Sequence, residues 1–283
     1  MKTPTPRTNR GTPSRLPLVR AVTLGILALG WLAPARSENV DSEMVLLVDI
    51  TRPGLNPTEF GRLMDGYASA FTSAQILDSI QSGAYGRIAV SMMFFGNSNT
   101  QLVGVPWMSI GNATEANTFA DLVRNVARPS SSGAPDLGAA LAAATLSFGT
   151  ETGGSANGFE SAVQIVEVAS GTVPQNGDAA NAAAGSAAAL AAGVELINAL
   201  ALGNRANQVD AFYEANVIGS TVNGVLPTSD TASINAALAG TMGGLLNDTV
   251  QTGAALSVTA VPEPSSAVGL IPATLLLLRR RRR

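Results

Sequence analysis

Short apolar runs alternate along this chain with longer segments in which apolar residues recur every three or four positions. Runs rich in Val, Ile and other apolar residues, bounded by turn residues, predict strands that are buried on both faces. They cover residues 44–48, 87–95, 162–169 and 194–202. Segments with helical spacing or rich in alanine predict helices over residues 57–71, 74–80, 114–126, 136–148, 178–192, 209–214 and 231–246.

This alternation of strands and helices predicts an α/β fold, with a doubly wound, mostly parallel sheet flanked by helices. One strand should be antiparallel, because residues 101–105 follow the second strand after a short polar turn and end at Pro106 and Trp107. The indole of Trp107 is then expected to cover the core or a sheet edge rather than to bind a ligand. A last strand is expected over residues 254–261.

Both ends of the 283-residue chain resemble targeting segments rather than parts of a fold. Residues 1–35 combine a basic leader, an apolar stretch and a small-x-small cleavage site, which is typical of a secretory signal peptide. Residues 40–250 are enough for one domain with a single core. Residues 251–261 form a tail or linker, and residues 262–283 contain a short apolar stretch followed by five arginines.

The charge of the domain differs from that of the whole chain. The full chain has a formal net charge of −3, but residues 37–261 contain six arginines against nineteen acids and no lysine, a net charge of −13. Such an acidic body is a poor nucleic-acid binder, because phosphate contacts need clustered Lys and Arg. The chain has no Cys and no His, which excludes disulfides, ordinary zinc sites, thiol nucleophiles and Ser-His-Asp triads.

The first strand ends in two side chains that carry oxygen, Asp49 and Thr51, at the edge where open α/β sheets bind ligands. A carboxylate and a hydroxyl two residues apart suit a hard cation such as Mg²⁺. The same side chains can instead satisfy N–H groups of the loop and of the following helix start, which is the commoner use of such residues. The spacing alone leaves both interpretations open.

Seven short segments carry a resemblance to a known family. They begin at Glu43 (EMVLLVD), Gly66 (GYASAF), Gly86 (GRIAV), Val105 (VPW), Asn157 (NGFE), Ala192 (AGV) and Asn216 (NVIG). In this order they resemble the von Willebrand factor A domain, and more closely a bacterial, secreted group of A-like proteins of unassigned function. The resemblance spans about residues 40–250 and implies the α/β fold described above.

Metal-binding members of that family use Asp-x-Ser-x-Ser on the first loop, a Thr on the second and an Asp on the third. The resemblance places Asp49 and Thr51 in the first two positions, whereas Pro53, Ala134 and Thr172 stand where the other ligands are expected. The implied metal site is therefore degenerate, with Asp49 and Thr51 as its remaining ligands. No cofactor is expected, and Mg²⁺ is the ion that such a remnant would hold.

Pro262, Glu263 and Pro264 precede the apolar stretch and the arginines of residues 279–283. This combination resembles the PEP-CTERM sorting signal of Gram-negative bacteria. The resemblance implies recognition by an exosortase-type membrane protease, with cleavage near the motif. The chain would meet the membrane only through this short span before processing, and would finish at the cell surface or outside the cell.

These features predict an exported, non-enzymatic binding or adhesion module of the cell surface or extracellular matrix, with a matrix protein or polysaccharide as partner. One alternative is a structural matrix protein without a specific ligand, whose acidic body acts in bulk. The other is a hydrolase with paired carboxylates, for which Asp49 and Asp136 are the acids placed near the ligand edge. Asp136 is also the acid best placed to replace a lost metal ligand. An acid pair in a deep cleft would favour the hydrolase, and a shallow, loop-lined edge would favour the binding module.

Overall fold

A mixed β-sheet forms the centre of the computed structural model, which describes residues 37–52, 54–131, 133–172, 178–203 and 205–221 and the backbone of residues 229–231. Its strands are β2 (Glu43–Asp49), β3 (Ile88–Phe95), β4 (Gln101–Ile110), β6 (Gln164–Ser170), β7 (Leu196–Ala201), β8 (Gly219–Ser220) and β9 (Ser229–Thr231). The order is β4-β3-β2-β6-β7-β8, and β9 also pairs with β7. All pairs are parallel except β3–β4 and β7–β8.

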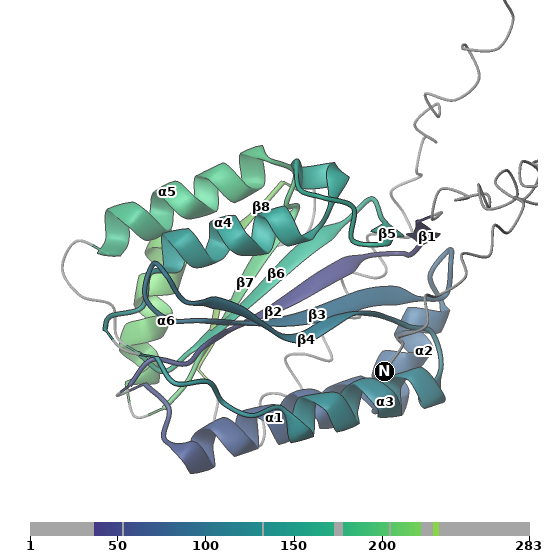
Figure 1. Ribbon diagram of the computed structural model, residues 1–283, viewed down its shortest axis with the longest axis horizontal. Coiled ribbons are helices and arrows are strands. Elements are labelled where there is room, and N and C mark those ends of the chain that lie inside the picture. Colours follow the sequence, from purple (N-terminus) through teal and green to yellow (C-terminus); the bar gives the residue numbers. More distant parts are fainter. Residues whose placement is uncertain are drawn as a thin grey trace, which may run out of the picture. The chain divides into compact units, whose positions relative to one another are not determined.

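Helices cover both faces of this sheet, which confirms the predicted α/β class with a mostly parallel, doubly wound sheet (Figure 1). One face is covered by α1 (Pro57–Phe71), α2 (Ala74–Gln81) and α3 (Ala113–Asn125). The other is covered by α4 (Leu137–Ser147), α5 (Asp178–Ala191) and α6 (Ala206–Asn216). Within the described residues, no helix is long and apolar enough to cross a membrane.

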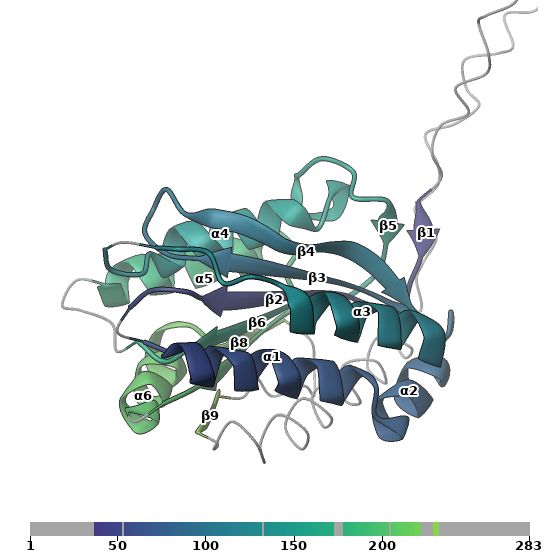
Figure 2. The same cartoon turned by 60° about the horizontal axis from the view of Figure 1, so that its bottom comes forward.

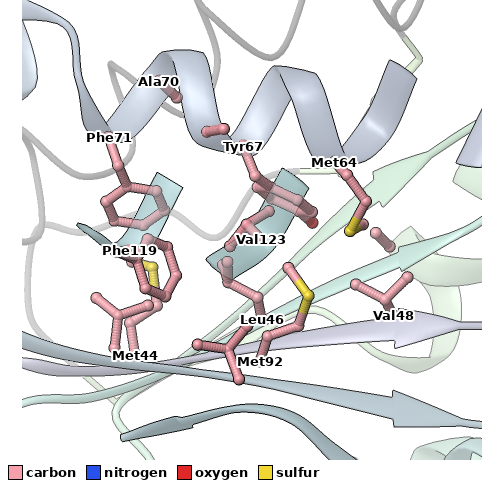
Figure 3. Close-up of a cluster of buried hydrophobic side chains, with 14 of the residues drawn as sticks. Met44, Leu46, Val48, Met64, Tyr67, Ala70, Phe71, Met92, Phe119 and Val123 are labelled. Atoms are coloured by element: carbon pink, nitrogen blue, oxygen red, sulfur yellow. The ribbon is translucent and has the colours of Figure 1, made fainter. Parts of the chain in front are cut away.

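Strand β2 is the central strand of the core. Its alternate side chains point to opposite faces, as the two-residue period of a strand requires. Met44, Leu46 and Val48 pack below α1 and α3, and Figure 3 shows Leu46 and Val48 beneath the α1 side chains. Val45 and Leu47 pack against the α4 and α5 face. The sequence prediction of a strand buried on both faces is therefore confirmed.

Local sequence signals explain where the helices begin and how closely they pack. Asn56 and Glu59 form a reciprocal capping box at the start of α1, and Pro57 takes the first helical position. The alanine-rich α5 packs on α4 through two glycines, because a Cβ on Gly185 would lie only 2.8 Å from the Cα of Gly138. The alanine-rich helix predicted over residues 178–192 is thus present, and part of its packing contact is with the neighbouring helix α4.

The structure corrects the sequence predictions at three places. The antiparallel strand does not stop at Pro106 but continues to Ile110, since β4 is an edge strand, where a residue without an N–H group is tolerated. One antiparallel strand was predicted, but there is a second, because β8 also pairs antiparallel, with β7. The chain also forms a small parallel pair, β1 (Glu38–Asn39) with β5 (Phe159–Glu160), that the sequence did not signal.

Other predictions lie outside the described residues. They are the signal peptide, the helix over residues 231–246, the strand over residues 254–261 and the C-terminal sorting signal with its apolar span. Trp107 covers the amino end of the sheet as expected. Its ring packs against Phe148 and Phe159, and its Nε1–H donates to the carbonyl oxygen of Ser147 at 2.9 Å.

Candidate functional site

The loops after β2 and β6 bring a carboxylate and three hydroxyl groups together at the carboxyl edge of the sheet, toward which the arrowheads of β2 and β3 point in Figure 2. Asp49, the last residue of β2, is only 2% exposed. Its Oδ1 accepts hydrogen bonds from the N–H and the Oγ1–H of Thr51, both at 2.7 Å. Its Oδ2 accepts a hydrogen bond from Ser170 Oγ at 2.6 Å. The carboxylate therefore has three donors within the protein.

Thr172 completes this group, which we call the Asp49 cluster (Asp49, Thr51, Ser170 and Thr172). Its Oγ1 lies 2.9 Å from Thr51 Oγ1, and its N–H donates to Ser170 Oγ at 2.9 Å. A Cβ on Gly54 would come within 2.3 Å of Thr172 Oγ1, so the close approach of the two loops requires glycine there. Side-chain hydrogen bonds thus hold the first and third loops together.

Tyr213 of α6 faces the same cluster, and no pattern in the sequence pointed to it. Its side chain is almost fully buried. Burial raises the pKa of its phenol, the negative charge of Asp49 raises it further, and a hydrogen bond with Ser170 acts in the opposite direction. The phenol is therefore neutral at physiological pH. With Ser170 and Thr172, it is the third polar group near the end of β6.

Arg128, on the loop between α3 and α4, is the second residue at this edge that the sequence did not signal. Its Nη1 donates to the carbonyl oxygen of Leu55, and its Nη2 donates to those of Ile50 at 3.0 Å and Thr51 at 3.1 Å. The guanidinium also lies 5.3 Å from the ring centroid of Phe60. The side chain therefore ties the second loop to the first.

The remaining residues of the second loop do not join the Asp49 cluster. Ala134 has no side-chain oxygen. Asp136 is the N-cap of α4, and its Oδ1 accepts hydrogen bonds from Ala139 N at 2.9 Å and from Asn181 Nδ2 at 2.7 Å. Its carboxylate thus links the starts of two helices. Pro53, the other residue named for this edge, lies outside the described residues.

The residues of this edge do not fit the divalent cation that the family resemblance implies. Mg²⁺ needs several oxygen ligands in near-octahedral geometry. Both oxygens of Asp49 already accept hydrogen bonds, and the cationic Arg128 binds the carbonyl groups beside it. Across the described residues there is also no group of three or more acidic, His or Cys side chains arranged to hold a metal.

A small pocket adjoins the Asp49 cluster on the α4 and α6 side. Its volume is about 20 Å³, which is room for one water-sized group. It is lined mainly by Phe95, Leu137, Ser170, Thr172, Phe212 and Tyr213. This pocket is small and mostly apolar.

The opposite, amino edge of the sheet contains a pair of carboxyl groups that the sequence did not reveal. Glu43, the first residue of β2, is fully buried. Its carboxyl accepts hydrogen bonds from Asn157 Nδ2 and Ser161 Oγ, and it shares a hydrogen bond with Glu151. Burial raises the pKa of Glu43 to about 8, and the charge of Glu151 adds to the effect. The pair therefore holds a proton at neutral pH.

Glu160 and Glu195 are two further carboxyl groups at this edge. Burial raises the pKa of Glu151, and the charge of Glu160 raises it further. Glu195, just before β7, accepts a hydrogen bond from the N–H of Gln164 at 2.6 Å, and burial raises its pKa to about 7. Paired carboxyls with raised pKa values are typical of some hydrolases; here Glu43 has no exposed surface, whereas Glu151 is half-buried.

Comparisons with known proteins identify a family of unassigned function. The family described as "Protein of unknown function (DUF1194)" matches residues 39–241. No curated protein matches the chain.

Three solved structures illustrate the likeness of fold. Proximal thread matrix protein 1 from the mussel byssus has a TM-score of 0.47 and 15% identity over 76% of this chain. The pilus adhesin SpaC from Lactobacillus rhamnosus GG has a TM-score of 0.49 and 12% identity over 76%. The SpRpn10 VWA domain has a TM-score of 0.40 and 16% identity over 74% of this chain and 93% of its own length. The alignments span only 48% of the mussel protein and 31% of SpaC. Similarities of this size say nothing about ligand or activity.

Proposed function

The chain belongs to the DUF1194 family of proteins of unknown function, and we propose that it is a non-enzymatic binding or adhesion module that works at the cell surface or in the extracellular matrix. The binding face is the carboxyl edge of the sheet, formed by the loops after β2 and β6 and the loop before α4. The partner is a matrix protein or a surface polysaccharide, and binding needs no metal ion.

The state of Asp49 is the observation that carries this proposal. It is the one carboxylate of the Asp49 cluster, and its oxygens are occupied by Thr51 and Ser170. A carboxylate with three internal donors is poorly suited to act as a general base. Asp136 caps α4 and also accepts a hydrogen bond from Asn181, and this supports a binding role over the hydrolase considered from the sequence. What remains at this edge is a pre-formed, hydrogen-bonded loop surface, which suits recognition.

Export is the part of the proposal that rests on the two ends of the chain. The signal-peptide pattern of residues 1–35 and the motif Pro262, Glu263 and Pro264 support secretion followed by exosortase-type processing. In a host with that machinery, the secreted protein should lack the leader and the terminal arginines. Intact-mass analysis measures this directly, and Glu263→Ala should leave the precursor in the membrane. Secreted protein that keeps residues 279–283 would contradict the processing step.

The binding face can be tested by blocking each edge in turn. The full chain is incubated with purified matrix polysaccharides and matrix proteins, with and without EDTA, and the amount captured is measured. Ala134→Trp adds bulk to an exposed position of the carboxyl edge, and Ala156→Trp does the same at the amino edge. We expect capture that Ala134→Trp abolishes and that neither Ala156→Trp nor EDTA changes. Equal capture by both variants would favour the structural matrix protein, and loss in EDTA would favour a working metal site.

A further inference from the structure

Two guanidinium groups lie beside the first loop of the carboxyl edge. Arg128 Nη2 donates to the carbonyl oxygen of Thr51 at 3.1 Å, and that carbonyl belongs to the peptide bond leading into Arg52. Arg52 is exposed. Burial lowers the pKa of Arg128, and the charge of Arg52 lowers it further, as expected for two cations held near each other. The first loop therefore carries one exposed positive charge, on Arg52, and is contacted by a half-buried one, on Arg128.

Neither arginine forms an ion pair with a carboxylate of the described residues. Asp49 is close enough to favour the charged form of Arg128, but its oxygens accept hydrogen bonds from Thr51 and Ser170. The Nε–H of Arg128 is buried and has no hydrogen-bond partner within the described part of the chain. A buried donor in this state commonly marks the place of a water molecule or a bound ion. The positive charge at this loop is thus incompletely compensated.

The rest of the domain has the opposite charge. Residues 37–261 carry six arginines against nineteen acids, and three of those six arginines, Arg52, Arg128 and Arg205, lie on loops of the carboxyl edge. The amino edge instead contains Glu43, Glu151 and other carboxyl groups. The carboxyl edge also carries Asp49, Asp136 and Asp178, but Asp49 and Asp136 accept hydrogen bonds within the protein. In this acidic domain the three arginines make the carboxyl edge the place where an anion is attracted most.

We propose that the first loop, with Arg52 exposed on it and Arg128 bound to its carbonyl groups, binds the carboxylate or sulfate groups of an acidic polysaccharide. This inference rests on the proposed function, since it names the chemistry of the partner that the carboxyl edge binds. A guanidinium matches such an oxyanion with two parallel N–H donors. An extended polymer reaches the loop through a few contacts. A folded acidic protein would have to bury roughly 800 Å² of its surface against this acidic domain, where like charges repel each other.

The test measures binding of the full-length protein to three polymers by isothermal titration calorimetry at low and at physiological salt. Alginate offers carboxylates, dextran sulfate offers sulfates, and neutral dextran is the control. We expect binding to at least one charged polymer, weaker at higher salt, and none to neutral dextran. Arg52→Gln should weaken binding about tenfold, because it removes a charge-assisted pair. Arg62→Gln, at an exposed arginine of α1, should change it by less than about twofold. The preferred polymer identifies the oxyanion.

Several results would overturn the inference. One is no binding of either charged polymer at low salt. Another is an equal loss in Arg52→Gln and Arg62→Gln, which would mean a diffuse charge effect. Polyglutamate is titrated in addition, and binding of polyglutamate without binding of the polysaccharides would assign an acidic peptide instead. If Ala134→Trp abolishes matrix capture while Arg52→Gln leaves it intact, the oxyanion site is wrong and the proposed binding face stands.

Discussion

Strand β2 carries a buried carboxyl group at each end, and the two are held in different ways. Asp49 at the carboxyl edge is 2% exposed and accepts three hydrogen bonds. Glu43 at the amino edge is 0% exposed, accepts hydrogen bonds from two donors and lies beside the carboxyl of Glu151. Burial raises the pKa of Glu43 to about 8, and the charge of Glu151 adds to the effect. Donors stabilise the charged form, whereas a second carboxyl opposes it.

The contrast separates the roles of the two edges. The carboxyl edge combines a carboxylate held by hydroxyl groups with nearby arginines, which makes it a fixed, polar surface. At the amino edge, carboxyl groups inside the fold share a proton near neutral pH. We therefore expect the free energy of unfolding to depend on pH through this edge. The following predictions test this division, from the largest expected effect to the smallest.

The most severe change breaks the strand that joins both edges. Leu47→Asp places a charge without a partner among the buried side chains of β2 that face α4 and α5. An unpaired buried charge costs several kcal/mol, which is a large part of the stability of a domain. We expect the variant to be unfolded or insoluble by circular dichroism. A soluble Leu47→Asp protein that melts cooperatively would show that β2 is not central.

At the amino edge, stability should fall as the pH rises. The folded state keeps the proton of Glu43 up to a pKa of about 8, whereas the unfolded state releases it near the ordinary glutamate pKa of 4.5. Between these values the folded state binds more protons, so the free energy of unfolding decreases with rising pH, by on the order of 3 kcal/mol in total.

Glu43→Gln should remove this pH dependence, because an amide keeps the size of the side chain and does not titrate. In urea unfolding, the free energy of unfolding of the variant should rise relative to that of the unmodified protein as the pH rises from 5 to about 8. The matched control is Glu214→Gln, at an exposed glutamate of α6, which should leave the profile unchanged. Identical profiles for the protein and for Glu43→Gln would show that the carboxyl pair does not hold the proton.

At the carboxyl edge, the expected effect is smaller and independent of metal. Asp49→Ala leaves Thr51 and Ser170 without their acceptor and should cost about 1–3 kcal/mol. Millimolar Mg²⁺ should leave the melting temperature of both proteins nearly unchanged, since a ligand raises it only by binding the folded state. A Mg²⁺-dependent rise that Asp49→Ala abolishes would establish a metal site and would point to Asp136 as the missing ligand.

The smallest effect concerns Glu195. Burial raises its pKa to about 7, so its contribution to stability is lost between the unfolded value of 4.5 and that pKa. Because the side chain is only partly buried, solvent screening reduces the effect to about 1 kcal/mol. Glu195→Gln should therefore flatten the urea profile slightly below pH 7 and not above it. A change confined to higher pH would assign that part of the profile to another group.

The amino-acid sequence by itself determined most of the described elements of this fold and the position of Asp49 and Thr51 at the carboxyl edge of the sheet. Continuous apolar runs predicted the buried strands, because both faces of a parallel strand are covered. Helical spacing and alanine content placed the starts of α1 and α4 at residues 57 and 136, within a residue of the observed starts. The pair Asp49 and Thr51 was recognisable because a strand and its loop are contiguous in the chain. The predicted end of the antiparallel strand at Pro106 was wrong, because a proline is tolerated in an edge strand and no local pattern reveals that β4 lies at the sheet edge.

Only the tertiary structure decided what those site residues touch. Ser170, Thr172 and Arg128 reach the first loop because β6 lies next to β2 and because the loop before α4 folds over the same edge. The Glu43 and Glu151 pair forms for the same kind of reason, at the other end. Such contacts depend on strand order and register between segments far apart in sequence, which local spacing does not encode. A carboxyl side chain thus accepts hydrogen bonds from hydroxyl groups at one edge and lies beside a second carboxyl at the other, because the packing of the two edges differs.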